Sequence, residues 1–509
     1  MTKNSTDVLV VGAGPTGLFL ALLLARLGAR VRILDETAEP GTTSRALAVQ
    51  ARTLEFYRQI DLADEVLRRG RILHALNLWR RGVRAAHVSL DDAGTGRSPY
   101  PFGVIFPQDE HERLLIERLT AAGVTVERQT KLVSFEERGD GVVASLRGPD
   151  GATSTVEAAY VAGCDGARST VRQAIGAQFP GGTYEHLFYV ADVSAKGEAV
   201  NGELHVFLDE AGFLGLFPLA GENRARLVGT IREDSARSGP VRWEDVDRRP
   251  VERAGLAIDG VNWFSTYRVH HRVADRFRRG RVFLLGDAAH IHSPVGGQGM
   301  NTGLGDAMNL GWKLASVLAA RANEDLLATY EPERIAFARR LVATTDRVFQ
   351  AASSDGKVAE VVRTQVVPRI VPRIAETAFG RSFLFRAVSQ TGIEYRASAW
   401  SSGRAGAVHA GDRLPWVPAT GDDNFAPLRS LDWQVHVYGG ATPELAGACE
   451  ERRLALRVFP ESDAAKKVDL RSDAVYLVRP DGYLGAVLDA RSAPRALGAY
   501  LDTHRIRVR

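Results

Sequence analysis

The stretch Asp7-Val8-Leu9-Val10-Val11-Gly12-Ala13-Gly14-Pro15-Thr16-Gly17 has the order of a buried strand, a glycine-rich turn and the start of a helix. Residues 18–27 are mostly apolar and predict that helix. Gly12 permits the tight turn, Gly14 lets a pyrophosphate approach the backbone, and Gly17 allows close packing of helix on strand. The helix N-terminus adds N–H groups and a positive dipole for the phosphates. The stretch therefore predicts an α/β fold that binds a nucleotide.

An acidic pair follows the next predicted strand. Val31–Leu34 is a short, largely apolar segment, and it ends at Asp35, with Glu36 next. An acidic side chain about 20 residues beyond such a loop accepts hydrogen bonds from ribose hydroxyls and disfavours a 2′-phosphate. The alternative is a glycine turn in an α/β domain that binds no nucleotide. That alternative does not explain why strand, loop, helix and acid occur together.

A second glycine-rich loop occurs much later in the chain. Residues 281–285 predict a strand that ends at Gly286-Asp287, and a carboxylate beyond a strand end can bind ribityl hydroxyls. Three glycines within 296–299 leave backbone amides bare, as the edge of a flavin ring requires, and 304–320 predicts a helix. Together the two loops predict one FAD, held at its adenosine end by the first loop and at its ribityl and ring end by the second.

A third motif lies between the two loops. Residues 160–164 predict a strand that leads into Asp165-Gly166-Ala167-Arg168-Ser169-Thr170-Val171-Arg172. With the glycine loop before it and the Gly-Asp pair after it, this motif resembles the group A flavoprotein monooxygenases, the single-component FAD-dependent aromatic hydroxylases. The resemblance covers about residues 5–345 and is strongest to the aromatic polyketide hydroxylase and phenol hydroxylase branch.

The resemblance implies roles for individual residues. Arg45 would contact the flavin or the incoming nicotinamide, Gln108 the flavin, and Leu132 the adenine, while Pro294 would place its carbonyl near the substrate. Arg45 and Pro294 are the candidate catalytic residues, and His290 would stabilise its loop. The full predicted cofactor set is Gly12, Gly14, Pro15, Thr16, Gly17, Asp35, Glu36, Arg45, Gln108, Leu132, Asp165, Gly286, Asp287, Pro294, Gly297, Gly299, Met300 and Asn301.

The same resemblance implies a reaction. NADPH or NADH would reduce the flavin, O2 would form a C4a-hydroperoxide, and its terminal oxygen would pass to a phenolic or polycyclic, polyketide-like substrate, as in antibiotic biosynthesis. Baeyer–Villiger insertion into a polycyclic ketone or quinone on the same scaffold is the alternative, and a non-catalytic flavin-binding protein is a further one. A second nucleotide-binding glycine loop, typical of two-Rossmann enzymes, is not found in the sequence.

The substrate and its base are less defined. Some simple-phenol hydroxylases have a histidine two positions after the flavin-contacting arginine, whereas this chain has Leu47, as aromatic polyketide hydroxylases do. This difference favours a multi-ring substrate. No general base is assigned, because a structural role is favoured for each candidate near the pocket. These candidates are Tyr189, His205, Tyr267, His270 and His271.

The predicted fold class is α/β (α+β), with three interleaved parts. A Rossmann-like, GR2-type FAD-binding domain takes residues 1–75, 100–178 and 275–395, the last part largely helical after residue 346. An antiparallel-sheet substrate domain takes 76–99 and 179–274. The resemblance implies a thioredoxin-like domain at 400–509, and because this domain lacks a Cys-x-x-Cys pair, a structural or assembly role is expected in place of redox work.

Composition supports a large globular enzyme. The 509 residues exceed one ordinary core, and 45% hydrophobic with 25% charged residues is typical globular usage. A net charge of +4 is too dilute to predict a nucleic-acid partner. The two cysteines form no metal or redox motif, so no metal is expected. The apolar run 18–27 is too short to span a membrane, so we expect a cytoplasmic protein, as a monomer or homodimer.

Overall fold

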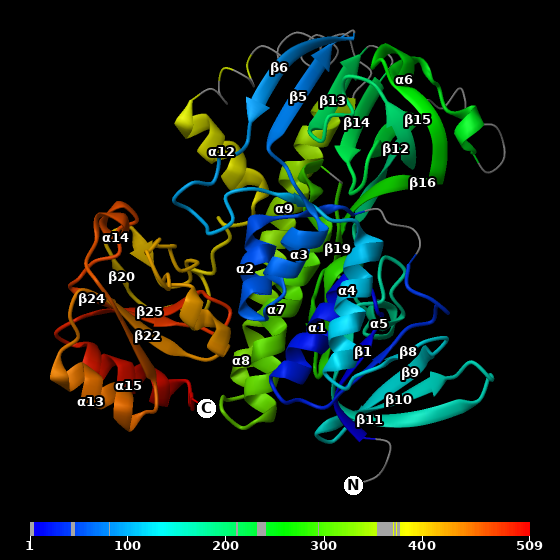
Figure 1. Ribbon diagram of the computed structural model, residues 1–509. Coiled ribbons are helices and arrows are strands. Elements are labelled where there is room, and N and C mark those ends of the chain that lie inside the picture. The colour runs from blue at the N-terminus through cyan, green and yellow to red at the C-terminus, as the bar shows by residue number, and fades with distance from the viewer. Residues whose placement is uncertain are drawn as a thin grey trace.

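A computed structural model describes residues 5–41, 46–80, 82–209, 212–231, 241–293, 295–353, 370, 373 and 377–508. Three parts are visible (Figure 1): a lower α/β part, an upper antiparallel sheet, and a C-terminal α/β part on the left, beside α2 and α8. The predicted contacts Arg45 and Pro294 lie outside the described residues. The domain limits predicted from sequence stay a prediction.

The lower sheet has the order β17-β18-β11-β1-β2-β8. Its core is parallel, because β1 pairs with β2 and β11, β2 with β8, and β11 with β18, all in parallel. The antiparallel strands β9 and β10 extend from β11. The bounds are β1 (Ser5–Val11), β2 (Val31–Leu34), β8 (Val126–Glu127), β9 (Lys131–Arg138), β10 (Gly141–Arg147), β11 (Thr153–Gly163), β17 (Arg278–Arg279) and β18 (Val282–Leu284).

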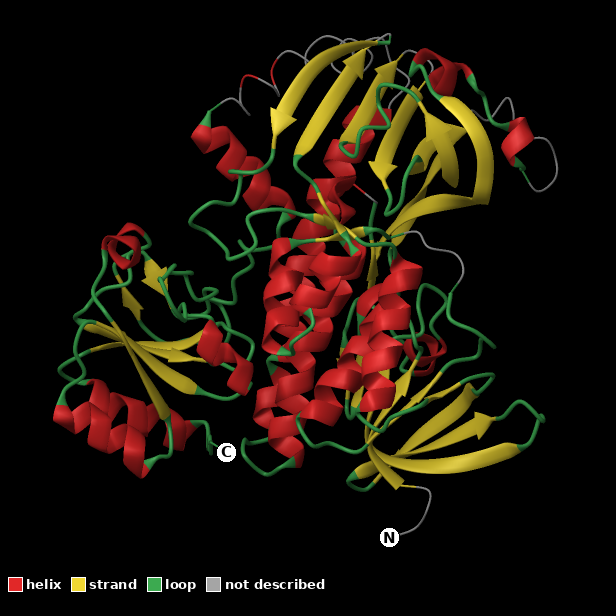
Figure 2. Ribbon diagram, in the orientation of Figure 1, coloured by secondary structure: helices red, strands yellow, loops and turns green. Residues whose placement is uncertain are grey.

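Helices pack beside this sheet, with α1 between α4 and α7 (Figure 2). Residues 17–24 of α1 are all buried. The helix is covered on every side, which explains why its sequence is apolar on every side. The helices here are α1 (Pro15–Arg26), α2 (Ala51–Gln59), α3 (Ala63–Arg69), α4 (Gln108–Ala121), α5 (Thr170–Ala174), α7 (Gly299–Leu318), α8 (Asp325–Ala328), α9 (Tyr330–Ser353) and α12 (Ala378–Val388).

Two sequence predictions need correction here. The helix expected at 304–320 is α7, which begins at Gly299 because the glycine-rich turn before residue 304 is itself helical. It ends at Leu318, since Ala320 has a left-handed φ of 54° and breaks the helical path. The strand expected at 281–285 is shorter, with β18 covering only Val282–Leu284. Of the helical stretch expected at 346–395, α9 and α12 cover the two ends, and most of what lies between them is outside the described residues.

The upper sheet has the order β19-β16-β12-β15-β14-β13-β5-β6. Neighbours are antiparallel except β5 and β13, so the 76–99 stretch joins this sheet through a parallel pair. From Leu227 to Ile231 of β15, buried residues alternate with partly exposed ones, and the buried Leu227 and Ile231 belong to the hydrophobic core of this upper part. The bounds are β5 (Ala75–Arg80), β6 (Val83–Ser89), β12 (Gly181–Lys196), β13 (Leu204–Asp209), β14 (Gly212–Pro218), β15 (Arg224–Ile231), β16 (Ala257–Val273) and β19 (His290–Ile291), with α6 (Arg249–Arg253) on one face.

A small sheet, β3 (Ala48–Val49), β7 (Val104–Ile105) and β4 (Arg71–Ile72), lies between the lower and upper parts. The C-terminal sheet has the order β23-β22-β24-β25, with β22 and β23 parallel and the other pairs antiparallel. This is the predicted thioredoxin-like arrangement, with a β–α–β unit before a hairpin and a last helix. Its elements are β22 (Gln434–Tyr438), α13 (Pro443–Glu451), β23 (Ala455–Phe459), α14 (Asp463–Lys467), β24 (Ala474–Val478), β25 (Leu484–Asp489) and α15 (Ala493–Thr503).

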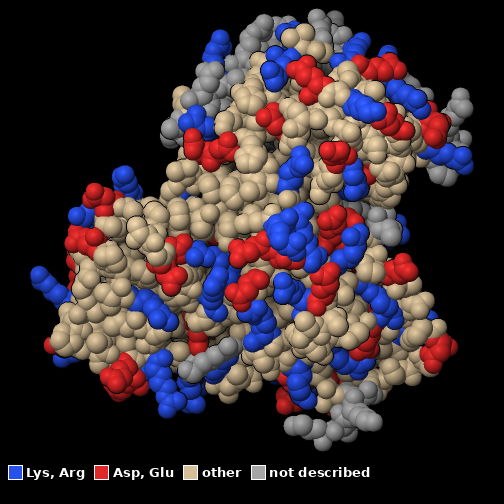
Figure 3. Space-filling model, in the orientation of Figure 1, with Lys and Arg blue, Asp and Glu red and all other residues tan. Residues whose placement is uncertain are grey.

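The surface carries both signs of charge. On the face shown in Figure 3, Lys and Arg side chains alternate with Asp and Glu side chains over all three parts. Within the ranges that the structure describes, no helix is both long and apolar enough to cross a membrane. The two cysteines are free thiols that lie far apart in the fold, Cys164 directly after β11 and Cys449 in α13.

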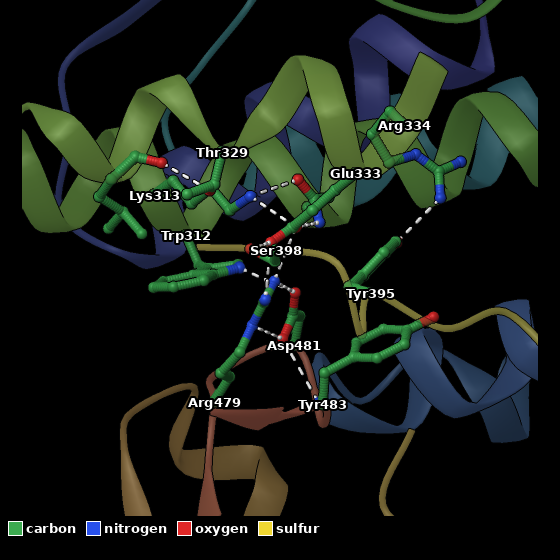
Figure 4. Close-up of polar contacts among 12 residues, drawn as sticks. Trp312, Lys313, Thr329, Glu333, Arg334, Tyr395, Ser398, Arg479, Asp481 and Tyr483 are labelled. Carbon is green, nitrogen blue, oxygen red and sulfur yellow. Dashed lines mark hydrogen bonds and ion pairs between the residues drawn. The ribbon is translucent and has the colours of Figure 1, made fainter. Parts of the chain in front are cut away.

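Buried charges dock the C-terminal part onto α7 and α9 (Figure 4). Arg479 contacts the Glu333 carboxylate at 2.9 Å and the Asp481 carboxylate at 2.6 Å. Lys313 contacts the same Glu333 at 2.8 Å, and Trp312 Nε1 donates to Asp481 Oδ2 at 3.0 Å. The Asp481-Gly482 turn joins β24 and β25 and supplies one of these carboxylates.

A second set of charges joins the C-terminal part to α2. Arg413 contacts Glu55 at 2.6 Å, and Arg52 contacts Glu55 at 2.7 Å while donating to the carbonyl of Asp481 at 2.7 Å. Arg52 and Glu55 are each only 1% exposed at their side chains. Isolated buried charges are costly, so each of these groups depends on its partners across the interface.

Glu333 is the shared carboxylate of the first set. Burial alone would raise the pKa of Glu333, but the charges of Arg479 and Lys313 outweigh burial and hold this pKa well below its ordinary 4.5. A carboxyl with a lowered pKa stabilises the fold above the pKa of the unfolded chain, and this stabilisation is lost as the pH falls through the folded pKa.

We expect Glu333→Gln to destabilise the protein by about 3–5 kcal/mol, because it leaves Arg479 and Lys313 buried without their carboxylate. Calorimetry at pH 7 should show a lower thermal midpoint. The gap to the wild-type protein should narrow on acidification, because protonation of Glu333 removes the same charge. The matched control Glu136→Gln breaks an exposed pair with Arg138 (64% and 66% exposed) and should leave the midpoint unchanged. Equal midpoints for the two variants would contradict this account.

Candidate active site

The first glycine loop and the third motif are in backbone contact. Gly12 has φ of +102°, and a Cβ built on it would lie 2.4 Å from the carbonyl oxygen of Cys164. A Cβ on Gly17 would lie 2.0 Å from the carbonyl oxygen of Gly12. Only glycine fits at either position, and the loop therefore lies directly against the strand end that precedes Asp165.

The second loop lies against the first through Thr16. A Cβ on Gly286 would lie 2.8 Å from Thr16 Oγ1, and one on Gly303 would lie 2.2 Å from the same atom. Gly286 also has a left-handed φ of +58°. The folded chain thus brings together the two loops that the sequence assigned to opposite ends of one cofactor.

Gly14 is different from these close contacts, because a Cβ on it would meet nothing within 4 Å. It is the N-cap residue of α1 and makes no side-chain cap, and Pro15 follows at the first helical position, where a missing N–H costs no hydrogen bond. The N-terminus of α1 therefore presents backbone to open space, with the favourable helix dipole. This geometry fits a bound pyrophosphate.

The predicted acidic pair divides into one loop residue and one surface residue. Asp35 Oδ2 accepts a hydrogen bond from Ala13 N at 2.7 Å, and Asp35 Oδ1 accepts from Thr37 N at 2.8 Å. Glu36 instead forms an exposed pair with Lys131 at 3.2 Å. Leu132 is buried at the start of β9. Asp35 is thus the acid that touches the glycine loop.

Arg128 is a residue at this end that the sequence reasoning missed. Its NH1 lies 3.9 Å from Asp35 Oδ1, and its buried NH2 has no hydrogen-bond partner in the part of the chain that the structure describes. An unpaired guanidinium nitrogen beside the ribose-binding candidate fits an additional polar ligand at the adenosine end. A lone arginine far from the glycine loop in sequence gives no motif by which to find it.

Gln108 begins α4 beside the segment that follows Arg45. Its Oε1 accepts weakly from Ala46 N at 3.4 Å, and its Nε2 donates to Glu112 Oε1 at 2.9 Å. Glu112 Oε2 in turn accepts from Gly41 N at 3.0 Å, and burial raises the pKa of this carboxyl. These bonds fix the two ends of the 41–46 segment.

The third motif braces its own helix and the second loop. Asp165 Oδ1 accepts from Ser169 Oγ at 2.5 Å and Oδ2 from Val171 N at 3.1 Å, while burial raises the pKa of Asp165. Arg172 NH1 donates to the carbonyl of Ala288 at 3.0 Å. Ser169 is the N-cap of α5, Asp165 holds Ser169 and the first turn of this helix, and Arg172 ties α5 to the loop that starts at Gly286.

Asp306 holds the second loop, and the sequence reasoning missed it. Its Oδ2 accepts from Gly286 N at 3.0 Å and lies 2.7 Å from His290 Nε2, while its Oδ1 accepts from Arg334 Nε at 2.6 Å. Burial alone would raise the pKa of Asp306, but Arg334 and His290 lower it. His290 is 2% exposed. These contacts fit the loop-stabilising role expected for His290.

The loop around η4 (Val295–Gly297) is held by Asn301. Its Oδ1 accepts from Gln50 N at 2.9 Å and Thr53 Oγ1 at 2.7 Å. Its Nδ2 donates to the carbonyls of Ala48 and Gly297, both at 2.8 Å. The Asn301 side chain thus fixes the loop to the segment before α2, so any contact from this residue to a cofactor is left to its backbone.

Glycines in this loop allow the close approach. Gly297 has φ of +61°, and a Cβ on it would lie 2.7 Å from Ala48 Cβ. Gly299 starts α7, which makes no side-chain cap at Gln298. Met300 Sδ lies 3.2 Å from His111 Nδ1, and the other ring nitrogen of His111 makes a short hydrogen bond with Tyr57. Burial lowers the pKa of His111 to about 3, so this histidine is a neutral packing residue.

Asp287 is exposed in η3 (Gly286–Ala288). Two buried polar atoms on nearby residues point to a ligand beside this loop. Nε2 of His292 and Oγ of Ser293 are buried, and neither has a hydrogen-bond partner among the described residues. Burial lowers the pKa of His292 to about 4, while its Nδ1 contacts the carbonyl of Ser293 at 2.8 Å. Unpaired buried polar atoms of this kind fit a bound cofactor that would complete them.

The upper sheet turns one face toward the loop region. Leu204 on β13 and Phe217 on β14 pack with Leu47 and Ile105 of the lower part. Leu47 lies one residue before Ala48, which contacts Asn301. The opposite face of the sheet packs on α6 through Leu214, Leu216 and Leu227. The face that carries Phe217 therefore forms a wall above the loop.

Most of the candidate bases have structural partners. Tyr189 and His205 belong to the far face of the sheet, where Trp79 Nε1 donates to His205 Nδ1 at 2.9 Å, and burial lowers the pKa of His205 to about 4. Tyr267 packs on Phe188.

A cavity of about 620 Å³ is lined by Arg71, Asn201, Pro218, Arg224 and their neighbours, and none of the predicted cofactor residues lines it.

Comparisons with known proteins agree with this geometry. Residues 5–345 match the FAD binding domain family. The chain is 37% identical over 430 residues to 6-methylpretetramide 4-monooxygenase of Streptomyces rimosus, covering 82% of this chain and 72% of that protein. It is 33% identical to 12-dehydrotetracycline 5-monooxygenase/anhydrotetracycline 6-monooxygenase of Streptomyces rimosus subsp. rimosus, covering 94% of both.

A solved structure is also similar along the whole chain. Aklavinone-11 hydroxylase, in a ternary complex with FAD and aklavinone, aligns with a TM-score of 0.79 and 27% identity over 99% of this chain and 100% of that one. The α/β fold class with a GR2-type FAD-binding part is therefore confirmed. The chain belongs to the FAD binding domain family and is a FAD-dependent monooxygenase.

Proposed function

We propose that this enzyme uses NAD(P)H and O2 to hydroxylate a phenolic ring of a polycyclic, polyketide-like substrate. The observation that carries the proposal is the convergence of the two glycine loops at Thr16, below the sheet face that carries Phe217. When bound, FAD supplies hydride acceptance and oxygen activation. The chain supplies binding, orientation and exclusion of water.

Each end of the cofactor has candidate residues. Gly14 and the N-terminus of α1 would hold the pyrophosphate, and Asp35 the ribose hydroxyls. Asp287 would bind the ribityl chain, and the backbone from Gly297 to Met300 would face the ring. Negative charge on the reduced ring would be stabilised by bare amides at the start of α7. Arg45 and Pro294 stay proposals from motif likeness, as contacts to the flavin and to the substrate.

The substrate class follows from Leu47 and from the relatives. Leu47 is 8% exposed and packs with Leu73, Ile105 and Leu219, so this wall is apolar where some simple-phenol hydroxylases have histidine. The names of the relatives described above indicate that they act on 6-methylpretetramide, anhydrotetracycline and aklavinone. A fused-ring phenol or quinone therefore suits this pocket better than a single-ring acid.

Gly14→Val should yield a folded protein that has lost FAD. The new side chain meets no protein atom near Cβ but fills the space proposed for the pyrophosphate. We expect FAD affinity to fall by about tenfold or more, which is about 1.4 kcal/mol, with an unchanged thermal midpoint of the apoprotein. Gly440→Val is the matched control, because Gly440 also has open space but lies in the C-terminal part.

Gly12→Ala provides the contrasting case. Its Cβ would collide with the Cys164 carbonyl at 2.4 Å in a backbone conformation of φ +102°, so the apoprotein itself should lose stability. Flavin absorbance of the purified variants and thermal scans of the stripped proteins separate the two effects. Stoichiometric FAD at wild-type affinity in Gly14→Val would show that the pyrophosphate lies elsewhere.

The reaction is tested with a panel of hydroxylated anthraquinones and naphthacenequinones. NADPH oxidation should accelerate when a suitable phenol is added, since substrate-gated reduction limits wasted peroxide. Under labelled O2 the product should gain one labelled oxygen on its ring. Incorporation of oxygen from labelled water, in a separate experiment, would contradict the proposal. A labelled lactone or ester formed under labelled O2 would identify Baeyer–Villiger insertion in its place.

A further inference from the structure

Three polar side chains meet where the upper sheet contacts α9. Tyr184 on β12 donates a short hydrogen bond to Asp346 on α9. His271 on β16 lies beside both, with ring centroids 4.8 Å from Tyr184 and with Nδ1 3.9 Å from Asp346 Oδ1. The side chains of His271 and Asp346 are 27% and 25% exposed, so the cluster is half-buried and accessible. None of these contacts belongs to the loops assigned to the cofactor.

The cluster lies on the sheet face that forms the wall above the flavin loop. Phe188 and Asp192 are four residues apart on β12 and point to the same face. Asp192 is opposite Arg226 on β15, and Arg226 is opposite Phe217 on β14. Directly opposed residues share a face, so Phe188 and Phe217 are on the same side. Tyr184 packs with Phe188, Tyr267 and Val269 on this side. His271 is two residues beyond Val269 on β16, so its side chain lies on the same face of the sheet as Val269.

The cluster is also next to the loop in the chain path. Arg272 pairs with Ile291, so His271 lies one residue from the strand pair that leads into Ser293 and η4. The helix that carries Asp346, α9, contacts both β16 and η4. Aromatic and aliphatic side chains flank His271 on the same face, as expected of a surface that receives a flat aromatic molecule.

His271 is incompletely satisfied by the protein. Its Nδ1 is buried and makes no hydrogen bond within the described ranges. Gly182 lies against the other edge of the ring, where a Cβ would be 2.8 Å from both Cε1 and Nε2. The adjacent His270 is different, because it points to the opposite face and its Nδ1 lies 2.7 Å from Thr183 Oγ1.

We propose that His271 binds the substrate's phenolic hydroxyl and accepts its proton, with Asp346 and Tyr184 as positioning residues. This inference rests on the proposed function. The phenol O–H bond breaks, the proton passes to the imidazole, and the electron pair stays on the phenolate oxygen, which enriches the ortho and para carbons. The Asp346 carboxylate faces the imidazolium that forms and stabilises its charge.

Tyr184 keeps Asp346 in place. Burial and the hydrogen bond to Asp346 raise the pKa of the Tyr184 hydroxyl, so it remains a donor to that carboxylate throughout the neutral range. Because Tyr184 stays protonated, it does not compete with His271 for the substrate proton. The arrangement is a hydroxyl, a carboxylate and an imidazole in sequence, drawn from three separate elements.

The test uses 2-hydroxyanthraquinone, a polycyclic phenol whose absorption moves to longer wavelength when it ionises. It is titrated into the oxidised holoenzyme, without NADPH, at pH 7, where the free phenol is mostly neutral in water. We expect a difference spectrum of the phenolate for the wild-type protein and for His270→Asn, and of the neutral phenol for His271→Asn. Asp346→Asn should give an intermediate spectrum. FAD content and thermal midpoint confirm that each variant is folded.

Turnover supplies the second measurement, with whichever phenol of the panel is most active. His271→Asn should lower kcat by about 100-fold, the effect of losing a general base, with a smaller change in KM. Addition of imidazole should restore part of kcat to His271→Ala. The role of His271 alone would be overturned if the wild-type protein bound 2-hydroxyanthraquinone as the neutral phenol, or if His271→Asn matched His270→Asn in both measurements. If no phenol accelerates NADPH oxidation by the wild-type enzyme, the proposed function falls, and this inference with it.

Discussion

A single buried carboxylate, that of Asp306, holds the geometry on which the candidate site depends. It accepts from the backbone of Gly286 and contacts the side chains of His290 and Arg334, so one residue of α7 fixes the start of the second loop and links it to α9. The carboxylate stays ionised although it is fully buried, because Arg334 and His290 lower its pKa. A neutral residue at this position would leave the buried Arg334 unpaired and the loop without its anchor.

The same two helices also carry the charges around Glu333 that dock the C-terminal part, with Lys313 about two turns beyond Asp306 on α7. Lys313 of α7 and Glu333 of α9 meet Arg479 from the C-terminal part, while Arg334, next to Glu333, donates to Tyr395 at 2.9 Å. The seam between α7 and α9 therefore contains charged groups from the loop end to the thioredoxin-like part. This explains how a domain without a Cys-x-x-Cys pair contributes to the enzyme: it completes the charges of the helices that hold the second glycine loop.

The upper sheet contributes shape and polarity in different places. Its apolar row, with Leu204 and Phe217, packs on Leu47. In the proposed function, this apolar contact would help to exclude water from the site. Its far edge brings Tyr184 and His271 to Asp346 of α9. An apolar wall with one polar cluster is the usual construction of a site that orients a large aromatic molecule.

The sequence by itself determined the backbone elements around the nucleotide loop. The run from Asp7 to Gly17 and the apolar helix after it are local patterns, in which glycine and apolar positions follow directly from strand, turn and helix geometry. The second loop was predictable for the same reason. The order of the three motifs identified the family, because these three patterns in this order are specific to it.

Only the tertiary structure decided what the polar side chains do. Asp306, Arg128 and the pairing of His271 with Asp346 had no local signal, because each depends on partners from other elements. Asn301 was predicted as a cofactor residue, yet all four of its side-chain hydrogen bonds hold protein segments together. A buried polar group is defined by the partners that satisfy it, and these partners become neighbours only when the chain folds.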